Sequence, residues 1–340
     1  MTELVPLQAV LTLTDPSGVA EARQHAARLA ARLDFDDTAA GQLALAATEA
    51  AGNMVKHGGG GKLLLKALNG GGRAGVEVLA LDQGPGMANV AESMRDGHST
   101  KGSPGTGLGA LQRMTSALEI WSQPGKGTLL RCEVWPKGAA APRERFLTGG
   151  VSVPKPGEEV CGDGWSVIQR SGHLLLFVVD GLGHGQYAAE AARVALDAVR
   201  KHAALKPGDV LETLHDALRP TRGAAAAVAL VQPERELCVF CGVGNIAASV
   251  QVHGKSRSMV SHNGILGHQV RKFQEFQYPF PRHALLLAHS DGIATHWDLN
   301  TYPGLEKRHP ALIAAALYRD HSRGRDDATV VAARPESVGA

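Results

Sequence analysis

A short segment of small and charged residues, GAAAPRER (138–145), divides the chain into two stretches with different patterns. Before it, long stretches with helical spacing alternate with short apolar runs, and an apparent hairpin around residues 123–127 ends this half. After it, many short strand-like runs carry aspartates at their ends. At roughly 150 residues per domain, the 340 residues predict two domains, 1–137 and 146–340, joined by the linker 138–145.

Composition excludes several classes of protein. The chain is 44% hydrophobic and 20% charged, which is typical of globular proteins. Its net charge of +2 gives no electrostatic footprint for nucleic acid or an acidic membrane. The longest apolar runs, 224–231 and 311–318, are far shorter than the ~20 residues of a membrane span. The amino terminus lacks the features of a secretory signal, and four cysteines make no disulfide framework. We therefore expect a cytoplasmic protein that binds neither nucleic acid nor membrane.

The first half predicts helices and strands in alternation, and a mixed sheet covered by helices on one face. Helices are expected at 19–33 (with Ser17 as N-cap), 37–57 and 107–117, and strands at 8–13, 62–68 and 76–81. The second half predicts another layered α/β domain. Its expected strands are 165–169, 174–179, 225–231, 237–241, 284–289 and 329–333, and its expected helices are 187–202, 210–218 and 311–318.

Three segments of the first half together predict a nucleotide site. Glu49 and Asn53 lie four residues apart on one expected helix and share a face. Asp82 follows an apolar strand and opens an Asp-x-Gly-x-Gly turn. The glycine-rich loop 102–109 leads into a helix, whose N-terminal N–H groups favour phosphate. On its own, a Glu-x-x-x-Asn pair is usually a solvated or capping pair, and an Asp-x-Gly-x-Gly segment is usually a turn without a binding role. The combination and its order carry the prediction.

These segments resemble the GHKL ATP-binding family, in particular its RsbT-type switch kinases. The resemblance spans residues 5–136 and includes NMVKHGGGG, DQGPGM, GLGALQRM and SQPGKGT. It implies a Bergerat-type ATP-binding α/β sandwich, with ATP and Mg²⁺ as ligands and a Ser or Thr of another protein as phosphate acceptor. Glu49 would be the general base, Asn53 would bind Mg²⁺, and Asp82 would receive the adenine amino group that Gly84 and Gly86 let approach. The implied phosphate lid and γ-phosphate contacts are Thr100, Lys101, Gly105, Thr106, Gly107, Leu108 and Gly109. For His57, a helix-end role is favoured over a ligand role.

Four aspartates of the second half stand at the ends of apolar strands: Asp163, Asp180, Asp291 and Asp326. Any single Asp-Gly is usually a turn. Strand ends, however, bring side chains to one rim of a sandwich, and gathered carboxylates repel one another unless divalent cations lie between them. Two Mg²⁺ or Mn²⁺ ions there would lower the pKa of a bridging water and clamp a phosphate oxygen.

This half resembles the SpoIIE and RsbX branch of the metal-dependent, type 2C protein phosphatases. The resemblance covers residues 150–335 and includes GDGW, VVDGLGHGQYAAEAA, CGVGNI, NGILG, SDGI and RDDAT. It implies an α-β-β-α sandwich with two Mn²⁺ or Mg²⁺ ions. Asp180 would bridge both metals, the Gly181 carbonyl would bind one of them, and Asp163 would complete that shell through waters. Asp291 and Asp326 would hold the other metal.

The neighbours of this expected metal site leave alternatives open. Asp327 is expected to point to the opposite face of an extended segment. His184 would either protonate the leaving serine oxygen or stabilise its loop by a hydrogen bond. No arginine is assigned to the substrate phosphate. Cys238 and Cys241 have zinc-like spacing, but they face opposite sides of a strand and lack a second pair, so we expect no zinc site.

The two resemblances predict a bifunctional partner-switching regulator: an ATP-dependent protein Ser/Thr kinase joined to a Mg/Mn-dependent phosphoprotein phosphatase. Both imply a STAS-domain protein as substrate, with a sigma factor or another switch protein as a further partner. In the alternative, the first domain sequesters a sigma factor or regulator and uses ATP only as a conformational ligand, while the phosphatase is active. A nucleotide-regulated phosphatase with an inactive kinase is a third hypothesis. The presence of Glu49 favours kinase activity, since binding alone needs no base.

Overall fold

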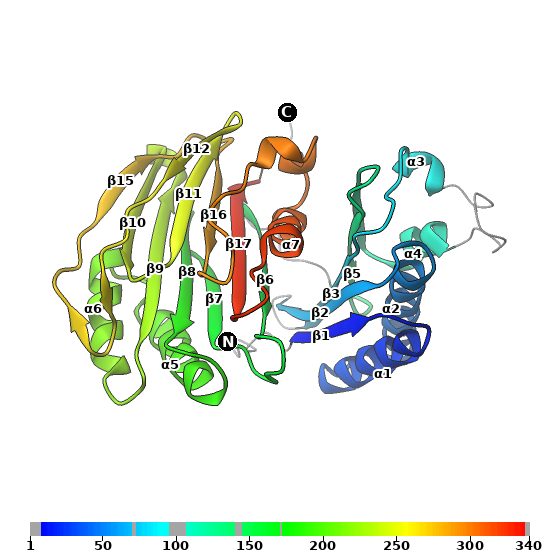
Figure 1. The fold of residues 1–340 in the computed structure, drawn as a ribbon, viewed down its shortest axis with the longest axis horizontal. Coiled ribbons are helices and arrows are strands. Elements are labelled where there is room, and N and C mark those ends of the chain that lie inside the picture. The colour runs from blue at the N-terminus through cyan, green and yellow to red at the C-terminus, as the bar shows by residue number, and fades with distance from the viewer. Residues whose placement is uncertain (1–7, 70–72, 95–106, 140–144, 171, 337–340) are drawn as a thin grey trace. The chain divides into compact units, whose positions relative to one another are not determined.

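The computed structural model describes residues 8–69, 73–94, 107–139, 145–170 and 172–336. The chain divides into two compact units, residues 1–143 and 144–340, which are considered separately below (Figure 1). Among the described residues, no helix combines the length and apolar character needed to cross a membrane.

The first unit contains a five-stranded sheet in the order β1-β2-β3-β5-β4. Its strands are β1 (Gln8–Leu13), β2 (Gly61–Asn69), β3 (Ala74–Leu81), β4 (Ala117–Ser122) and β5 (Thr128–Val134). All four pairings are antiparallel, so the prediction of a mixed sheet is wrong. Two helices in succession connect β1 to β2, and this helical pair reverses the chain direction, whereas one crossover helix would give parallel strands.

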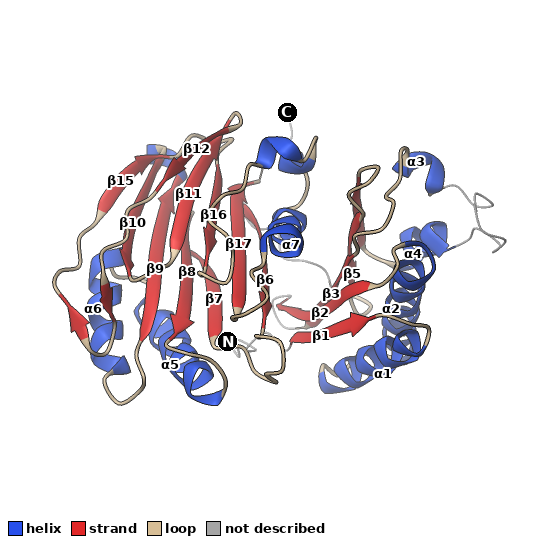
Figure 2. Cartoon of the chain, in the orientation of Figure 1, coloured by secondary structure: helices blue, strands red, loops and turns tan. Residues whose placement is uncertain are grey.

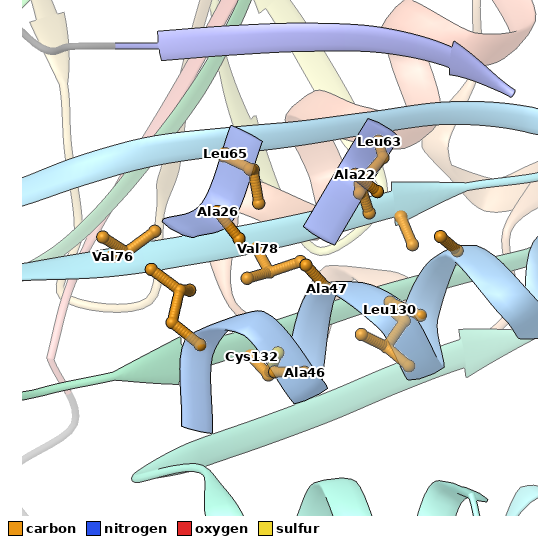
Figure 3. Close-up of a cluster of buried hydrophobic side chains, with 14 of the residues drawn as sticks. Ala22, Ala26, Ala46, Ala47, Leu63, Leu65, Val76, Val78, Leu130 and Cys132 are labelled. Carbon is orange, nitrogen blue, oxygen red and sulfur yellow. The ribbon is translucent and has the colours of Figure 1, made fainter. Parts of the chain in front are cut away.

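Helices α1 (Ser17–Arg32), α2 (Asp37–His57) and α4 (Gly107–Met114) cover one face of this sheet, and α3 (Val90–Ser93) is a single turn (Figure 2). The buried side of α1 and α2 is mostly alanine, so these two helices approach the sheet closely. The packed residues include Ala22, Ala26, Ala46, Ala47, Leu63, Leu65, Val76, Val78, Leu130 and Cys132 (Figure 3).

Two predicted helix ends in the first unit need correction. Pro16 takes the N-cap position of α1 and Ser17 is its first residue, because Asp15 Oδ1 accepts the Ser17 N–H at 2.8 Å. Helix α4 ends at Met114, three residues before the predicted end at 117. The chain then joins the sheet, since the Ser116 N–H donates to the Glu133 carbonyl at 2.8 Å.

The second unit is a four-layer α-β-β-α sandwich, as expected (Figure 1). One sheet has the order β15-β10-β9-β8-β7, and the other has the order β12-β11-β16-β17-β6. The strands of the first sheet are β7 (Asp163–Arg170), β8 (His173–Gly181), β9 (Ala224–Gln232), β10 (Leu237–Val243) and β15 (Phe276–Pro279). Those of the second are β6 (Phe146–Val153), β11 (Ala247–Val252), β12 (Lys255–Ser258), β16 (Leu285–His289) and β17 (Ala328–Pro335), and β13 (Gly264–Ile265) pairs separately with β14 (Gln269–Val270).

Helices form the outer layers of this sandwich. Helices α5 (Gln186–His202) and α6 (Pro207–Leu218) pack on the first sheet, and α7 (Pro310–His321) packs on β6 and β17. Cys238 lies in the core between the sheets, while Cys241 lies in the core under α5 and α6. The two thiols therefore face different layers, as expected.

Strand β6 was not predicted, because two glycines interrupt its apolar pattern. A Cβ on Gly149 would overlap the Ala311 backbone of α7, and a Cβ on Gly150 would lie 2.7 Å from the Trp165 ring. The glycines thus permit close packing on both faces of a strand, and they do not mark a turn.

Candidate nucleotide and metal sites

The predicted base and magnesium ligand of the first unit lie at the start of α4. A Cβ on Gly107 would lie 2.8 Å from Glu49 Oε2 and 3.7 Å from both carboxamide atoms of Asn53. The Asn53 Nδ2 atom is buried and has no hydrogen-bond partner among the described residues. A buried amide without a partner is costly, so this corner of the unit is suited to a polar ligand. The residues fit a nucleotide and its cation.

Asp82 is fixed at the end of β3 by backbone donors. Its Oδ1 atom accepts the Gly84 N–H at 2.9 Å and the Thr128 N–H at 3.0 Å. The residue is 8% exposed. The carboxylate is therefore held in one orientation by its own turn and by β5. A residue that recognises the amino group of a flat ligand needs such a fixed orientation.

The glycines around Asp82 are required by contacts within the protein. A Cβ on Gly84 would lie 2.6 Å from Gly58 Cα and 2.9 Å from the carbonyl of His57, at the end of α2. Gly86 has φ +69°, and a Cβ there would overlap the Gln123 carbonyl. The predicted role of Gly84 and Gly86 in admitting a ligand remains a prediction. The predicted role of the His57 side chain also remains a prediction.

A pair of glycines in the β4–β5 turn tests whether this turn supports the Asp82 site. Gly125 and Gly127 have φ +75° and +73°, so alanine is similarly strained at both. A Cβ on Gly127 would overlap the Asp82 carbonyl, whereas one on Gly125 meets nothing within 4 Å. We expect Gly127→Ala to weaken binding of a non-hydrolysable ATP analogue about tenfold or more. Gly125→Ala should bind like the wild type in the same calorimetric titration, and equal losses in both variants would contradict this role of the turn.

Part of the predicted phosphate lid is described and part is not. Gly107, Leu108 and Gly109 form the first turn of α4. The predicted contacts Thr100, Lys101, Gly105 and Thr106 lie outside the described residues.

Three of the four predicted aspartates of the second unit line one pocket of about 460 Å³. Asp180 lies near the end of β8, Asp291 follows β16 and Asp326 precedes β17, so both sheets contribute. The other lining residues are Leu182, Gly183, Ala225, Gly244, Asn245, Asn263, Gly264 and Ile265.

Asp163 and Gly181 are not among the residues that line this pocket. Asp163 pairs with Asp180 across β7 and β8 and is 7% exposed. Its Oδ2 atom accepts a 2.6 Å hydrogen bond from the Ser290 hydroxyl, which itself accepts the Thr329 N–H. Burial and the charge of Asp180 raise the pKa of Asp163 well above its usual value. The Gly181 N–H donates to the Gly162 carbonyl at 3.0 Å.

The pocket carboxylates interact electrostatically. Burial, together with the charges of Asp291, Asp326 and Asp327, raises the pKa of Asp180 to about 7. Among the described residues, no three His, Cys, Asp or Glu side chains lie close enough to form a ready-made metal cage. The carboxylates share a pocket without closing around one point. Oxygen-only donors are the ligands that Mg²⁺ and Mn²⁺ prefer, so the donor set fits these ions.

Two side chains that hold the aspartates were not predicted from the sequence. Asn245 donates from Nδ2 to Asp291 Oδ2 at 2.7 Å, and Ser290 holds Asp163. Asn245 lies two residues after the end of β10, in the CGVGNI segment that is part of the family resemblance. Asp327 is not among the residues that line the pocket, and its Oδ1 atom accepts the Lys155 N–H at 2.8 Å. His184 contacts Glu158 at 2.6 Å, the kind of contact that a loop-stabilising role requires.

Comparisons with known proteins match the two halves of the chain to different families. Residues 13–133 match the histidine kinase-like ATPase domain, and residues 170–336 match stage II sporulation protein E (SpoIIE). The chain is 30% identical over 117 residues to the serine/threonine-protein kinase RsbT of Bacillus subtilis (strain 168), covering 34% of this chain and 88% of RsbT. It is 26% identical over 151 residues to the phosphoserine phosphatase RsbX of the same strain, covering 44% of this chain and 76% of RsbX.

A solved structure supports the fold of the second unit. The crystal structure of RsbX in complex with magnesium matches with a TM-score of 0.51 and 23% identity, covering 57% of this chain and 98% of that one. The chain therefore belongs to the family of histidine kinase-like ATPase domains through its RsbT-like first part, and its second part is a SpoIIE-type phosphatase domain with the type 2C fold.

Proposed function

We propose that this chain is a bifunctional switch enzyme of the cytoplasm. Its first domain (1–137) transfers phosphate from ATP to a serine or threonine of a STAS-domain protein. Its second domain (146–340), reached through the linker 138–145, removes phosphate from such a protein. The observation that carries the proposal is the convergence of Asp180, Asp291 and Asp326 on one pocket, in a chain that also has Glu49 beside the start of α4.

In the kinase half, the proposed roles are supported by where the side chains lie. Glu49 takes the proton of the attacking hydroxyl. Asn53 would hold the Mg²⁺ that accompanies ATP, and Asp82, which is fixed by two N–H groups, accepts a hydrogen bond from the adenine amino group. The first turn of α4 offers free N–H groups and its positive dipole end to the phosphates. RsbT, which this half resembles, is named a serine/threonine-protein kinase.

In the phosphatase half, Asp180, Asp291 and Asp326 would hold divalent cations, and Asp163, which pairs with Asp180 across β7 and β8, would support them. When bound, the cations supply charge neutralisation and a water that ionises near neutral pH. Asn245 orients Asp291, and Ser290 orients Asp163. RsbX is named a phosphoserine phosphatase and has been solved with magnesium, which supports this assignment.

One labelling experiment tests both activities. The full chain is incubated with γ-labelled ATP, Mg²⁺ and a candidate STAS-domain protein, and Mn²⁺ is then added after ATP is removed. We expect label to enter the STAS-domain protein and then to appear as free phosphate. Label that never enters, despite measurable ATP binding, would contradict the kinase and favour the sequestration alternative. Label that enters but is never released would contradict the phosphatase.

A further inference from the structure

The pocket of the second unit poses an electrostatic problem for a phosphate monoester. Of the described residues that line it, three are aspartates and none carries a positive side chain. Since a phosphoserine side chain is itself close to a dianion, carboxylates around the pocket repel it. Bound cations offset part of this repulsion. A positively charged side chain at the rim would supply further attraction on the side from which the substrate enters.

Arg222 stands at that rim. Its Nη1 atom would lie 3.3 Å from a Cβ on Gly183, a lining residue, and Ala225, three residues further on, also lines the pocket. Its guanidinium lies over the Tyr187 ring, 4.7 Å from the ring centroid. No hydrogen bond or ion pair of this guanidinium is found among the described residues.

Stacking on the Tyr187 ring leaves the N–H groups of Arg222 available for hydrogen bonds. A guanidinium stacked on an aromatic face is attracted through its own face, so its N–H groups, which lie in its plane, still point outward. A carboxylate partner would use those donors and cancel the charge. Arg219, in the same loop, shows this other arrangement, since its Nη2 atom pairs with Asp216 Oδ1 at 3.0 Å.

The backbone around Arg222 is fixed on both sides. Its carbonyl accepts a 2.9 Å hydrogen bond from His268 Nε2, and the next carbonyl, that of Gly223, accepts the Leu182 N–H at 3.0 Å. Gly223 has φ +80°, and a Cβ there would lie 2.6 Å from His268 Cδ2. The loop therefore holds Arg222 in a set position beside the segment that follows Asp180.

We propose that Arg222 binds the phosphoryl group of the substrate phosphoserine and, with Tyr187 as its support, determines specificity for phosphate monoesters at this pocket. This inference rests on the proposed phosphatase function. The planar guanidinium offers two parallel N–H donors, which match two phosphate oxygens. Arg222 acts on substrate binding, while the chemistry belongs to the aspartates and their cations.

The test compares Arg222→Gln with Arg219→Gln in the full chain loaded with Mn²⁺. We expect Arg222→Gln to weaken binding of inorganic phosphate, measured by calorimetry, about tenfold, and Arg222→Lys to retain part of the affinity. Tyr187→Ala should weaken it about threefold. The KM for a phosphoserine peptide should rise in parallel with little change in kcat. Mn²⁺ affinity should be equal in all variants, which shows that the pocket is intact.

The inference would be overturned if the phosphate affinity and the KM of the Arg222→Gln variant both lay within twofold of those of the Arg219→Gln variant. A wild-type protein that binds Mn²⁺ but no phosphate would overturn it as well. A wild-type protein that binds phosphate without hydrolysing any phosphoprotein would instead contradict the proposed function, and the calorimetric comparison would still decide the role of Arg222.

Discussion

Asp291→Asn is expected to lower dephosphorylation of a phosphoserine protein by more than about a hundredfold while leaving phosphate transfer from ATP unchanged. The substitution keeps the shape of the side chain and removes the negative charge that Asp291 brings to the pocket it shares with Asp180 and Asp326. A neutral amide is a weaker ligand for a hard cation. Mn²⁺ affinity, measured by calorimetry on the same protein, should fall with the rate.

The matched control for this change is Asp216→Asn, which removes one negative charge from an exposed surface pair with Arg219. It should leave Mn²⁺ affinity and both activities near their wild-type values, since exposed pairs contribute little. If Asp291→Asn also behaves like the wild type, the pocket is not the metal centre. If it abolishes both activities, the two sites are not independent.

The aspartates of this pocket were predictable because their signal is local. Each follows or precedes a short apolar strand, and Asp180 and Asp291 precede glycine. A carboxylate at such a position is unfavourable for core packing and well placed at the rim of a sandwich. Which of the four aspartates line the pocket, and which is a buried partner, could not be predicted. This depends on the pairing of β7 with β8, which puts Asp163 opposite Asp180, and on the hydrogen bond from Ser290, which follows β16 of the other sheet, to Asp163.

The same distinction holds for the fold. The limits of α2 were predicted correctly, because an Asp36 cap precedes it and glycines follow it. Strand direction in the first sheet was predicted wrongly, because no local pattern records that α1 and α2 together reverse the chain. Asn245 was missed as a site residue for a related reason. Its partner, Asp291, is 46 residues away, and only the sandwich brings the two together.

Glu49→Gln is expected to reduce phosphate transfer to the STAS-domain protein by about a hundredfold or more, which is the usual contribution of a general base. Binding of a non-hydrolysable ATP analogue should stay within a few-fold of the wild type, because the proposed adenine and phosphate contacts come from Asp82 and the start of α4. Glutamine keeps the length of the side chain next to Gly107, so the packing there is preserved. Transfer and binding are measured on the same preparation.

Glu21→Gln is the control for this change, since Glu21 is an exposed residue of α1 that contacts only His25 across one helical turn among the described ion pairs. It should alter neither transfer nor binding. Full transfer by Glu49→Gln would remove the residue from its role as base, because no neutral amide can take the hydroxyl proton. Loss of ATP binding together with transfer would mean that Glu49 holds the nucleotide or its cation. Only loss of transfer with binding retained separates a catalytic domain from one that uses ATP as a conformational ligand, because in the second case the carboxylate has no proton to accept.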